Sequence, residues 1–136
     1  MRGLNGVFLV ARGILAYMFQ EPGHEVVANY LEESCISSVN LLEVASRLSR
    51  DGVSPKPVLE MIQTLGIAVV PFSMEHVSTS ARLAATAKQY GLSMADRICL
   101  GLGLDLNLPV LTGDTTRVEI GSECDVILFR NDTSPG

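Results

Sequence analysis

The sequence predicts an α/β protein of three layers (α/β/α), in which a parallel sheet of about five strands is covered by helices on both faces. Short, continuously apolar stretches bounded by turn residues alternate with longer stretches that have one apolar side. The composition favours a single core, because the chain has 136 residues, of which 47% are hydrophobic. We expect one domain over residues 1–130 and a loose tail over 131–136.

Turn and capping residues bound the elements predicted in the first half of the chain. The turn at residues 21–23 separates two helices, Asp51-Gly52 ends a third, and Ser54 with Pro55 opens a fourth that Gly66 ends. In order, the elements are strand Val7–Val10, helix Ile14–Phe19, helix His24–Glu33, strand Cys35–Ser38, helix Asn40–Arg50 and the helix after Ser54.

The second half continues the alternation of strands and helices. Its elements are strand Ile67–Phe72, an alanine-rich helix Val77–Tyr90, a helix from Ser93 to about Leu106, and strands Pro109–Thr112 and Val126–Arg130. Crossovers between parallel strands are right-handed, and the carboxyl ends of parallel strands lie on one edge of the sheet. Ligands of such sheets bind at this edge, near the switch in strand order.

Composition and cysteine usage narrow the possible functions. A net charge of −5 without a basic run argues against tight nonspecific binding along a duplex, but it allows a nuclease with a small acidic metal pocket. We expect Cys35, Cys99 and Cys124 to be buried free thiols of a reducing cytosol, since all three lie far apart in apolar segments. A zinc site is not expected, because His24 and His76 are isolated and are predicted to lie on the surface.

The N-terminal apolar run does not predict a membrane segment. Arg12 interrupts the run, no small-x-small cleavage site follows it, and it is too short to span a bilayer. We expect a cytoplasmic protein without membrane contact.

Three acidic residues occur where the sheet edge should lie. Glu43 is in the predicted first turn of the helix after the second strand, Asp96 is in the first turn of the helix opened by Ser93, and Asp114 follows the fourth strand within LTGD. Each also has a purely structural explanation. Ser93 and Asp96 form a capping-box pattern, Glu43 suits a helix dipole, and Asp114 suits a turn.

Together the three acids indicate a cation site. Two unit charges ~4 Å apart repel by roughly 4 kcal/mol at an effective dielectric constant near 20, so gathered carboxylates require a counter-charge. Hard oxygen ligands without Cys or His suit Mg²⁺ or Mn²⁺.

Four segments resemble PIN-domain proteins, of the toxin kind found in VapBC toxin–antitoxin pairs: CISSVNLLEVASRL, IAVVPF, YGLSMADRICLGLGLDLNLPVLTGD and VILFR. The resemblance implies a PIN-like fold and a metal-dependent endoribonuclease that activates water at one or two Mg²⁺ or Mn²⁺ ions. Carried over, Glu43, Asp96 and Asp114 would be metal ligands, and Thr112 a supporting polar group. Ser38 and Asn40 would orient Glu43.

The first strand departs from the family pattern. The family ends this strand with an aspartate, followed two residues later by a serine or threonine, whereas this chain has Val10 and Arg12 at these positions. Valine offers no lone pair, so we predict weak metal binding or none, and weak or absent RNase activity. Three roles for Arg12 remain open: counter-charge to the acids, contact with RNA phosphate, or exposure to solvent.

Three classes of function remain in competition. The first is a toxin-type endoribonuclease of RNA, and the second is an inactive PIN protein that dimerises and binds a small antitoxin protein. The third is a nucleotide-binding domain of the same layered topology. The resemblance implies a homodimer, for which helices Asn40–Arg50 and Ser54–Leu65 are candidate interfaces. Arg97 and Arg117 stand beside two of the acids, where salt bridges or phosphate contacts are the alternatives.

Overall fold

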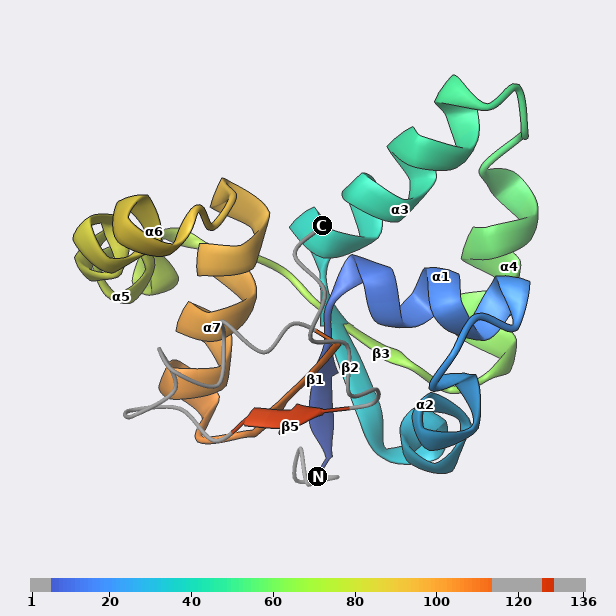
Figure 1. The fold of residues 1–136 in the computed structure, drawn as a ribbon, viewed down its shortest axis with the longest axis horizontal. Coiled ribbons are helices and arrows are strands. Elements are labelled where there is room, and N and C mark those ends of the chain that lie inside the picture. The colour runs from blue at the N-terminus through green and yellow to red at the C-terminus, as the bar shows by residue number, and fades with distance from the viewer. Residues whose placement is uncertain (1–5, 114–125, 129–136) are drawn as a thin grey trace.

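A computed structural model describes residues 6–113 and 126–128 and contains a five-stranded parallel sheet (Figure 1). The strands lie in the order β3-β2-β1-β4-β5, so β1 is the central strand and has two strands on each side. This arrangement confirms the predicted fold class. The strands are β1 (Val7–Leu9), β2 (Ser34–Ser37), β3 (Ala68–Val70), β4 (Val110–Thr112) and β5 (Val126–Leu128).

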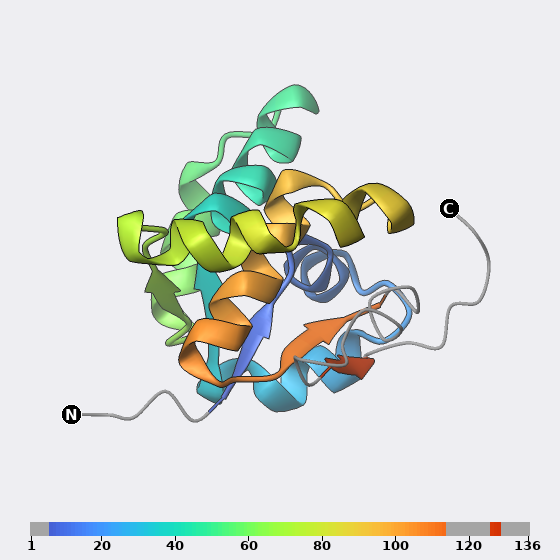
Figure 2. The same cartoon turned by 90° about the vertical axis from the view of Figure 1, so that its left-hand side faces the viewer.

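Helices cover both faces of the sheet. Helix α7 packs against β1, β2 and β4, with α5 and α6 outside it, while α1 and α2 lie on the opposite side (Figures 1 and 2). The described helices are α1 (Ala11–Phe19), α2 (His24–Tyr30), α3 (Ser38–Arg50), α4 (Lys56–Thr64), α5 (Val77–Arg82), α6 (Ala84–Tyr90) and α7 (Met94–Leu106), with short 3-10 turns η1 (Leu31–Glu33) and η2 (Met74–His76). None of these described helices is long and apolar enough to cross a membrane.

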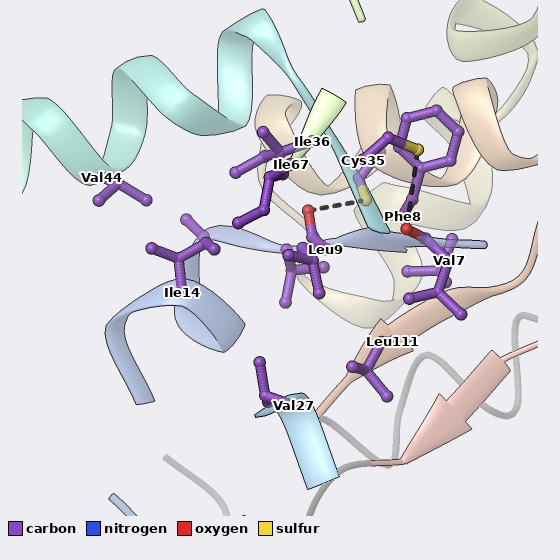
Figure 3. Packing of buried hydrophobic residues seen from close by; sticks show 14 of the residues in the cluster. Val7, Phe8, Leu9, Ile14, Val27, Cys35, Ile36, Val44, Ile67 and Leu111 are labelled. Carbon is purple, nitrogen blue, oxygen red and sulfur yellow. Dashed lines mark hydrogen bonds between the residues drawn. The ribbon is translucent and has the colours of Figure 1, made fainter. Parts of the chain in front are cut away.

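The core is aliphatic and centres on β1, which is buried along its whole length (Figure 3). Each Val, Leu, Ile or Phe side chain fully buried there stabilises the fold by about 1.5–3 kcal/mol relative to exposure. Cys35 and Cys99 are buried free thiols, as predicted, whereas Cys124 lies outside the described residues. Burial raises the pKa of the Cys35 thiol to about 12, so this thiol stays protonated at neutral pH.

Two helices begin earlier than the sequence predicted. Helix α1 begins at Ala11, because Val10 is still extended (φ −81°, ψ 161°) while its carbonyl already accepts a hydrogen bond from the Gly13 N–H (3.0 Å). Arg12 therefore lies in the first turn of α1 and not in a connecting turn. Helix α3 begins at Ser38, since the Ser37 hydroxyl caps it by accepting from the Asn40 N–H (2.8 Å).

The predicted helix Val77–Tyr90 is interrupted at Leu83, which separates α5 from α6. The ψ angle of Leu83 (−2°, with φ −79°) departs from the α-helical value of about −42°. Weak helix formers in the sequence VSTS make α5 easy to interrupt. The glycines expected to end helices do so: Gly66 and Gly91 both adopt the left-handed conformation, at φ 73° and 69°. Strand β3 is shorter than the predicted Ile67–Phe72, and residues 129–136, including the expected tail, lie outside the described part.

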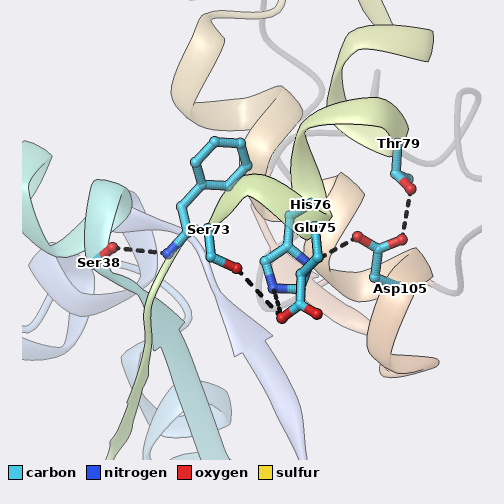
Figure 4. Close-up of polar contacts among 7 residues, drawn as sticks. Ser38, Ser73, Glu75, His76, Thr79 and Asp105 are labelled. Carbon is cyan, nitrogen blue, oxygen red and sulfur yellow. Dashed lines mark hydrogen bonds and ion pairs between the residues drawn. The ribbon is translucent and has the colours of Figure 1, made fainter.

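His76 is buried, so its predicted surface position was wrong. Its Nδ1 lies 2.9 Å from Asp105 Oδ2, and Thr79 donates a hydrogen bond to the other oxygen of Asp105 (2.6 Å), as Figure 4 shows. Its Nε2 lies 3.5 Å from an oxygen of Glu75. The carboxylate of Asp105 on α7 thus binds η2 and α5 together, a contact that crosses 29 residues of sequence.

Candidate active site

A pocket of about 410 Å³ opens at the carboxyl edge of the sheet, beside the ends of β1 and β4. Strand order reverses around β1 at this point, so the pocket occupies the switch position where parallel α/β sheets bind ligands. The lining residues are Val10, Ala11, Arg12 and Leu15 from the start of α1, Glu43, Arg47 and Arg50 from α3, Gly91, Ser93 and Asp96 around the start of α7, and Thr112 at the end of β4.

Glu43 reaches the pocket from the second turn of α3. The helix begins at Ser38 and has no acid in its first turn, so the first-turn position predicted for Glu43 was wrong. A helix dipole acts within about the first turn, so it no longer explains this residue. The exposed side chain of Glu43 lies on the same face as Arg47 and Arg50, at spacings of four and seven residues.

Asp96 combines a structural role with a place on the pocket. Ser93 accepts a hydrogen bond from the Asp96 N–H (3.2 Å), and Asp96 Oδ2 accepts one from the Ser93 N–H (3.1 Å). This capping box confirms the sequence pattern and holds the carboxylate in one orientation at the start of α7.

Thr112 completes the described polar lining at the end of β4, where it is fully buried. Asp114, the third predicted acid, lies outside the described residues, as does Arg117. Within residues 6–113 and 126–128 there is no group of three or more His, Cys, Asp or Glu side chains arranged to hold a metal ion. The structure therefore brings two of the three predicted acids to one pocket.

Val10 and Arg12 line the same pocket as the two acids. Val10 follows the central strand and is only 4% exposed, so its apolar side chain occupies the position directly after β1. Arg12 is exposed and forms no ion pair with Glu43 or Asp96 in the described part of the chain. Direct pairing of Arg12 with these two acids is therefore not formed in this structure.

The hydrogen bonds of the Asn40 and Ser38 side chains go to groups other than Glu43, and their role in orienting Glu43 stays a prediction. Asn40 is fully buried, accepts a hydrogen bond from the Ser37 hydroxyl, and donates from Nδ2 to the Ala95 carbonyl (3.3 Å). It therefore joins the first turns of α3 and α7. The Ser38 hydroxyl accepts from the backbone N–H of Phe72 (3.2 Å; Figure 4), which ties α3 to the segment after β3.

Sequence reasoning missed Arg47 and Arg50 as pocket residues. Their signal was present, because Glu43, Arg47 and Arg50 recur with helical spacing on one face. Arg97, for which a salt bridge or a phosphate contact was expected, makes no ion pair among the described residues and does not line the pocket.

Strand order and pocket together define a parallel α/β protein with a charged pocket, lined by two acids and three arginines, at the topological switch point. Comparison with protein families gives a match to the PIN domain over residues 7–121, and the chain belongs to this family. No curated protein sequence gives a significant match.

Solved structures with the same fold include several toxin–antitoxin complexes. A chain of a toxin–antitoxin complex from Klebsiella pneumoniae superposes with a TM-score of 0.73 at 12% identity, covering 93% of this chain and all (100%) of that one. A chain of VapBC2 from Rickettsia felis bound to promoter DNA gives 0.71 at 15% identity, covering 90% and 97%. FitAB bound to the IR36 DNA fragment gives 0.71 at 17%, covering 96% and 99%.

Proposed function

We propose that this chain is a toxin-type PIN protein whose metal-dependent cleavage of RNA is weakened or lost through Val10. The fold shared with chains of VapBC and FitAB complexes supports the toxin class. The carboxylates of Glu43 and Asp96 on one switch-point pocket support hydrolysis of a phosphodiester. The observation that carries the proposal is the buried, apolar Val10 in this same pocket.

The donor set fits a hard cation, but incompletely. The described lining contains carboxylate oxygens and neither Cys nor His, which suits Mg²⁺ or Mn²⁺. Glu43 and Asp96, with Asp114 from outside the described residues, would hold such an ion. When bound, the ion would activate water and stabilise charge on the phosphate.

The chain's own residues would position this site. The capping box fixes the Asp96 carboxylate, and Asn40 fixes the helix that carries Glu43 against the helix that carries Asp96. Val10 supplies no oxygen where the family pattern has a carboxylate, so one ligand is lost and the position of the ion is less well defined.

The proposal is tested by restoring the family pattern with Val10→Asp/Arg12→Ser. We expect this variant to cleave single-stranded RNA or tRNA in Mn²⁺ faster than the unchanged chain by at least 10–100-fold, roughly the loss that removing even an outer-shell partner of a metal ligand causes. Gel electrophoresis of labelled RNA measures the rate.

Val10→Ala/Arg12→Ser is the matched control, because it changes the same positions without adding a carboxylate. Equal and brisk cleavage by the unchanged chain and the restored variant would contradict the proposal. Thermal melting checks that an aspartate in place of Val10 is tolerated at this buried position, and calorimetric titration of the unchanged chain gives a second measurement. Tight Mn²⁺ binding by that chain would also count against a weakened site.

A second candidate function is a binding module that retains partner binding without cleavage. Leu42 and Met94 favour it, since both are more than 60% exposed (63% and 67%) and are chain neighbours of the pocket residues Glu43 and Ser93. Exposed apolar side chains beside a site are suited to coverage by a partner. Under this function the chain forms a homodimer and binds a small antitoxin protein. Absence of Mn²⁺ binding at millimolar concentration, together with no cleavage, supports it over the enzyme.

A further inference from the structure

Three arginines gather on the pocket of an acidic protein. Arg12, Arg47 and Arg50 line it, so three of the ten Lys and Arg residues of a chain with net charge −5 meet at one place. Arg12 comes from α1, and the other two come from α3, which packs against α1 (Figure 1). The pocket therefore has basic side chains on two adjacent helices.

Internal contacts do not account for these arginines. All three are exposed, and no ion pair or side-chain hydrogen bond involves them within residues 6–113 and 126–128. Each guanidinium carries five N–H donors in a planar fork that matches the oxygens of a phosphate.

Helix dipoles explain only part of the arrangement. Arg47 and Arg50 lie in the last turn of α3, where a cation is favourable. Arg12 lies in the first turn of α1, where the dipole disfavours a cation, and no acid shares that turn. A common anionic ligand accounts for all three positions.

The shape of the site favours an unpaired nucleic acid strand. A pocket of about 410 Å³ is concave and small, whereas binding along a duplex needs an extended basic surface, and the sequence has a net charge of −5 and no basic run. Successive phosphates of a single strand can meet guanidiniums on both helices.

We propose that Arg12, Arg47 and Arg50 form a phosphate-binding track that holds single-stranded RNA without a divalent metal ion. This proposal rests on the proposed function, because it takes RNA as the ligand of the same pocket. In this proposal the arginines bind the RNA strand, whereas the acids serve only its cleavage. RNA binding is therefore kept in a chain that has Val10 at the family's aspartate position, even where cleavage is lost.

The test measures fluorescence anisotropy of a labelled RNA of about 12 nucleotides, within the usual site size of single-strand binders, in EDTA at several salt concentrations. We expect the unchanged chain to bind. The slope of log K against log salt concentration is negative. Changing Arg12, Arg47 or Arg50 singly to Gln should make it less negative by about 0.7. Arg47→Gln/Arg50→Gln should lower the affinity by at least about tenfold at low salt, as loss of two phosphate contacts implies.

Arg82→Gln on α5 is the matched control, because it removes the same charge from a position that does not line the pocket. We expect its salt slope to equal that of the unchanged chain. Arg47→Lys/Arg50→Lys keeps the charge but removes the planar fork, and it should bind with intermediate affinity. Thermal melts confirm that every variant is folded.

An unchanged slope in Arg47→Gln/Arg50→Gln, an equal loss in Arg82→Gln, or binding that requires Mn²⁺ would overturn the track. So would displacement of the RNA by polyglutamate at equal charge concentration, since that result indicates an acidic peptide ligand. The two proposals fail separately. If Val10→Asp/Arg12→Ser binds RNA in EDTA but does not cleave it in Mn²⁺, the nuclease proposal alone is contradicted. Cleavage by that variant with unchanged binding in Arg47→Gln/Arg50→Gln contradicts the track alone.

Discussion

At the scale of single residues, the buried amide of Asn40 links the two helices that carry the described acids. Its side chain makes one hydrogen bond within the first turn of α3 and one to the Ala95 carbonyl at the start of α7. A buried polar group that loses its partner costs about 1–3 kcal/mol. The position of Glu43 relative to Asp96 therefore depends on a residue that ligates nothing itself.

We predict that Asn40→Ala lowers the free energy of unfolding by about 1–3 kcal/mol, because the Ser37 hydroxyl and the Ala95 carbonyl then lose a buried partner. Urea denaturation measures the change. Asn29→Ala, on an exposed position of α2, is the control and should change stability little. A loss no larger than that of the control would show that the amide does not hold α3 to α7.

Parallel-sheet topology predicted that Glu43 and Asp96 lie at one edge of the sheet, whereas the detailed contacts of the site could be predicted only where their signal was local. The capping box of Ser93 and Asp96 was visible as a pattern, and it is present in the structure. The burial of His76 was not visible, since its partner Asp105 is 29 residues away. Metal ligation by Glu43, Asp96 and Asp114 stays a prediction.

At the scale of elements, α5 and α7 approach closely through small residues. A Cβ added to Gly101 on α7 would collide with the Ser80 hydroxyl on α5 and lie 3.3 Å from the Ser80 Cα, so α5 or the Ser80 side chain would have to shift. Ser80 is 6% exposed, and its hydroxyl has no hydrogen-bond partner among the described residues. The contact thus contains a buried polar group whose desolvation is not compensated.

We predict that Ser80→Ala stabilises the protein by about 0.5–1 kcal/mol, because it removes an unpaired buried hydroxyl and alanine is the better helix former. Gly101→Ala should destabilise it by up to about 2 kcal/mol, because overpacking costs about 1–3 kcal/mol and replacing a helical glycine by alanine offsets about 1 kcal/mol. Thermal unfolding measures both, with the exposed Ser78→Ala on the same helix as the control. Marked destabilisation by Ser80→Ala would mean that the hydroxyl has a partner after all.

The order of helices and strands could be predicted because apolar runs and turn residues indicate it in the sequence. The residues at which the elements begin and end depend on backbone and side-chain contacts. The first turn of α3 was missed because Ser37 ends β2 and caps the helix at once, without a loop. The helical spacing of Arg47 and Arg50 from Glu43 was a local signal, but their position beside Arg12 depends on the packing of α1 against α3, which no local pattern states.

At the scale of the whole molecule, apolar side chains remain exposed along one helical unit. Leu42 on α3, Val53 between α3 and α4, and Leu59 on α4 are exposed to 63%, 49% and 43%. Helices α3 and α4 are those expected from sequence to supply a dimer interface. Exposed apolar groups of this kind are typical of surfaces that a partner covers.

We predict a homodimer, twice the chain mass of 14.6 kDa by light scattering, that Leu59→Glu converts to monomer. In an interface with two-fold symmetry every substitution occurs twice, so two carboxylates enter one apolar contact and lose solvation without a counter-charge. Because Leu59 is 43% exposed in the single chain, the monomer itself should stay folded, which circular dichroism checks.

Met74→Glu, at a residue 86% exposed on η2, adds the same charge away from α3 and α4 and should leave the dimer intact. If the unchanged chain is monomeric at high concentration, the predicted dimer does not exist. If Met74→Glu dissociates the dimer as much as Leu59→Glu does, the interface does not lie on α3 and α4.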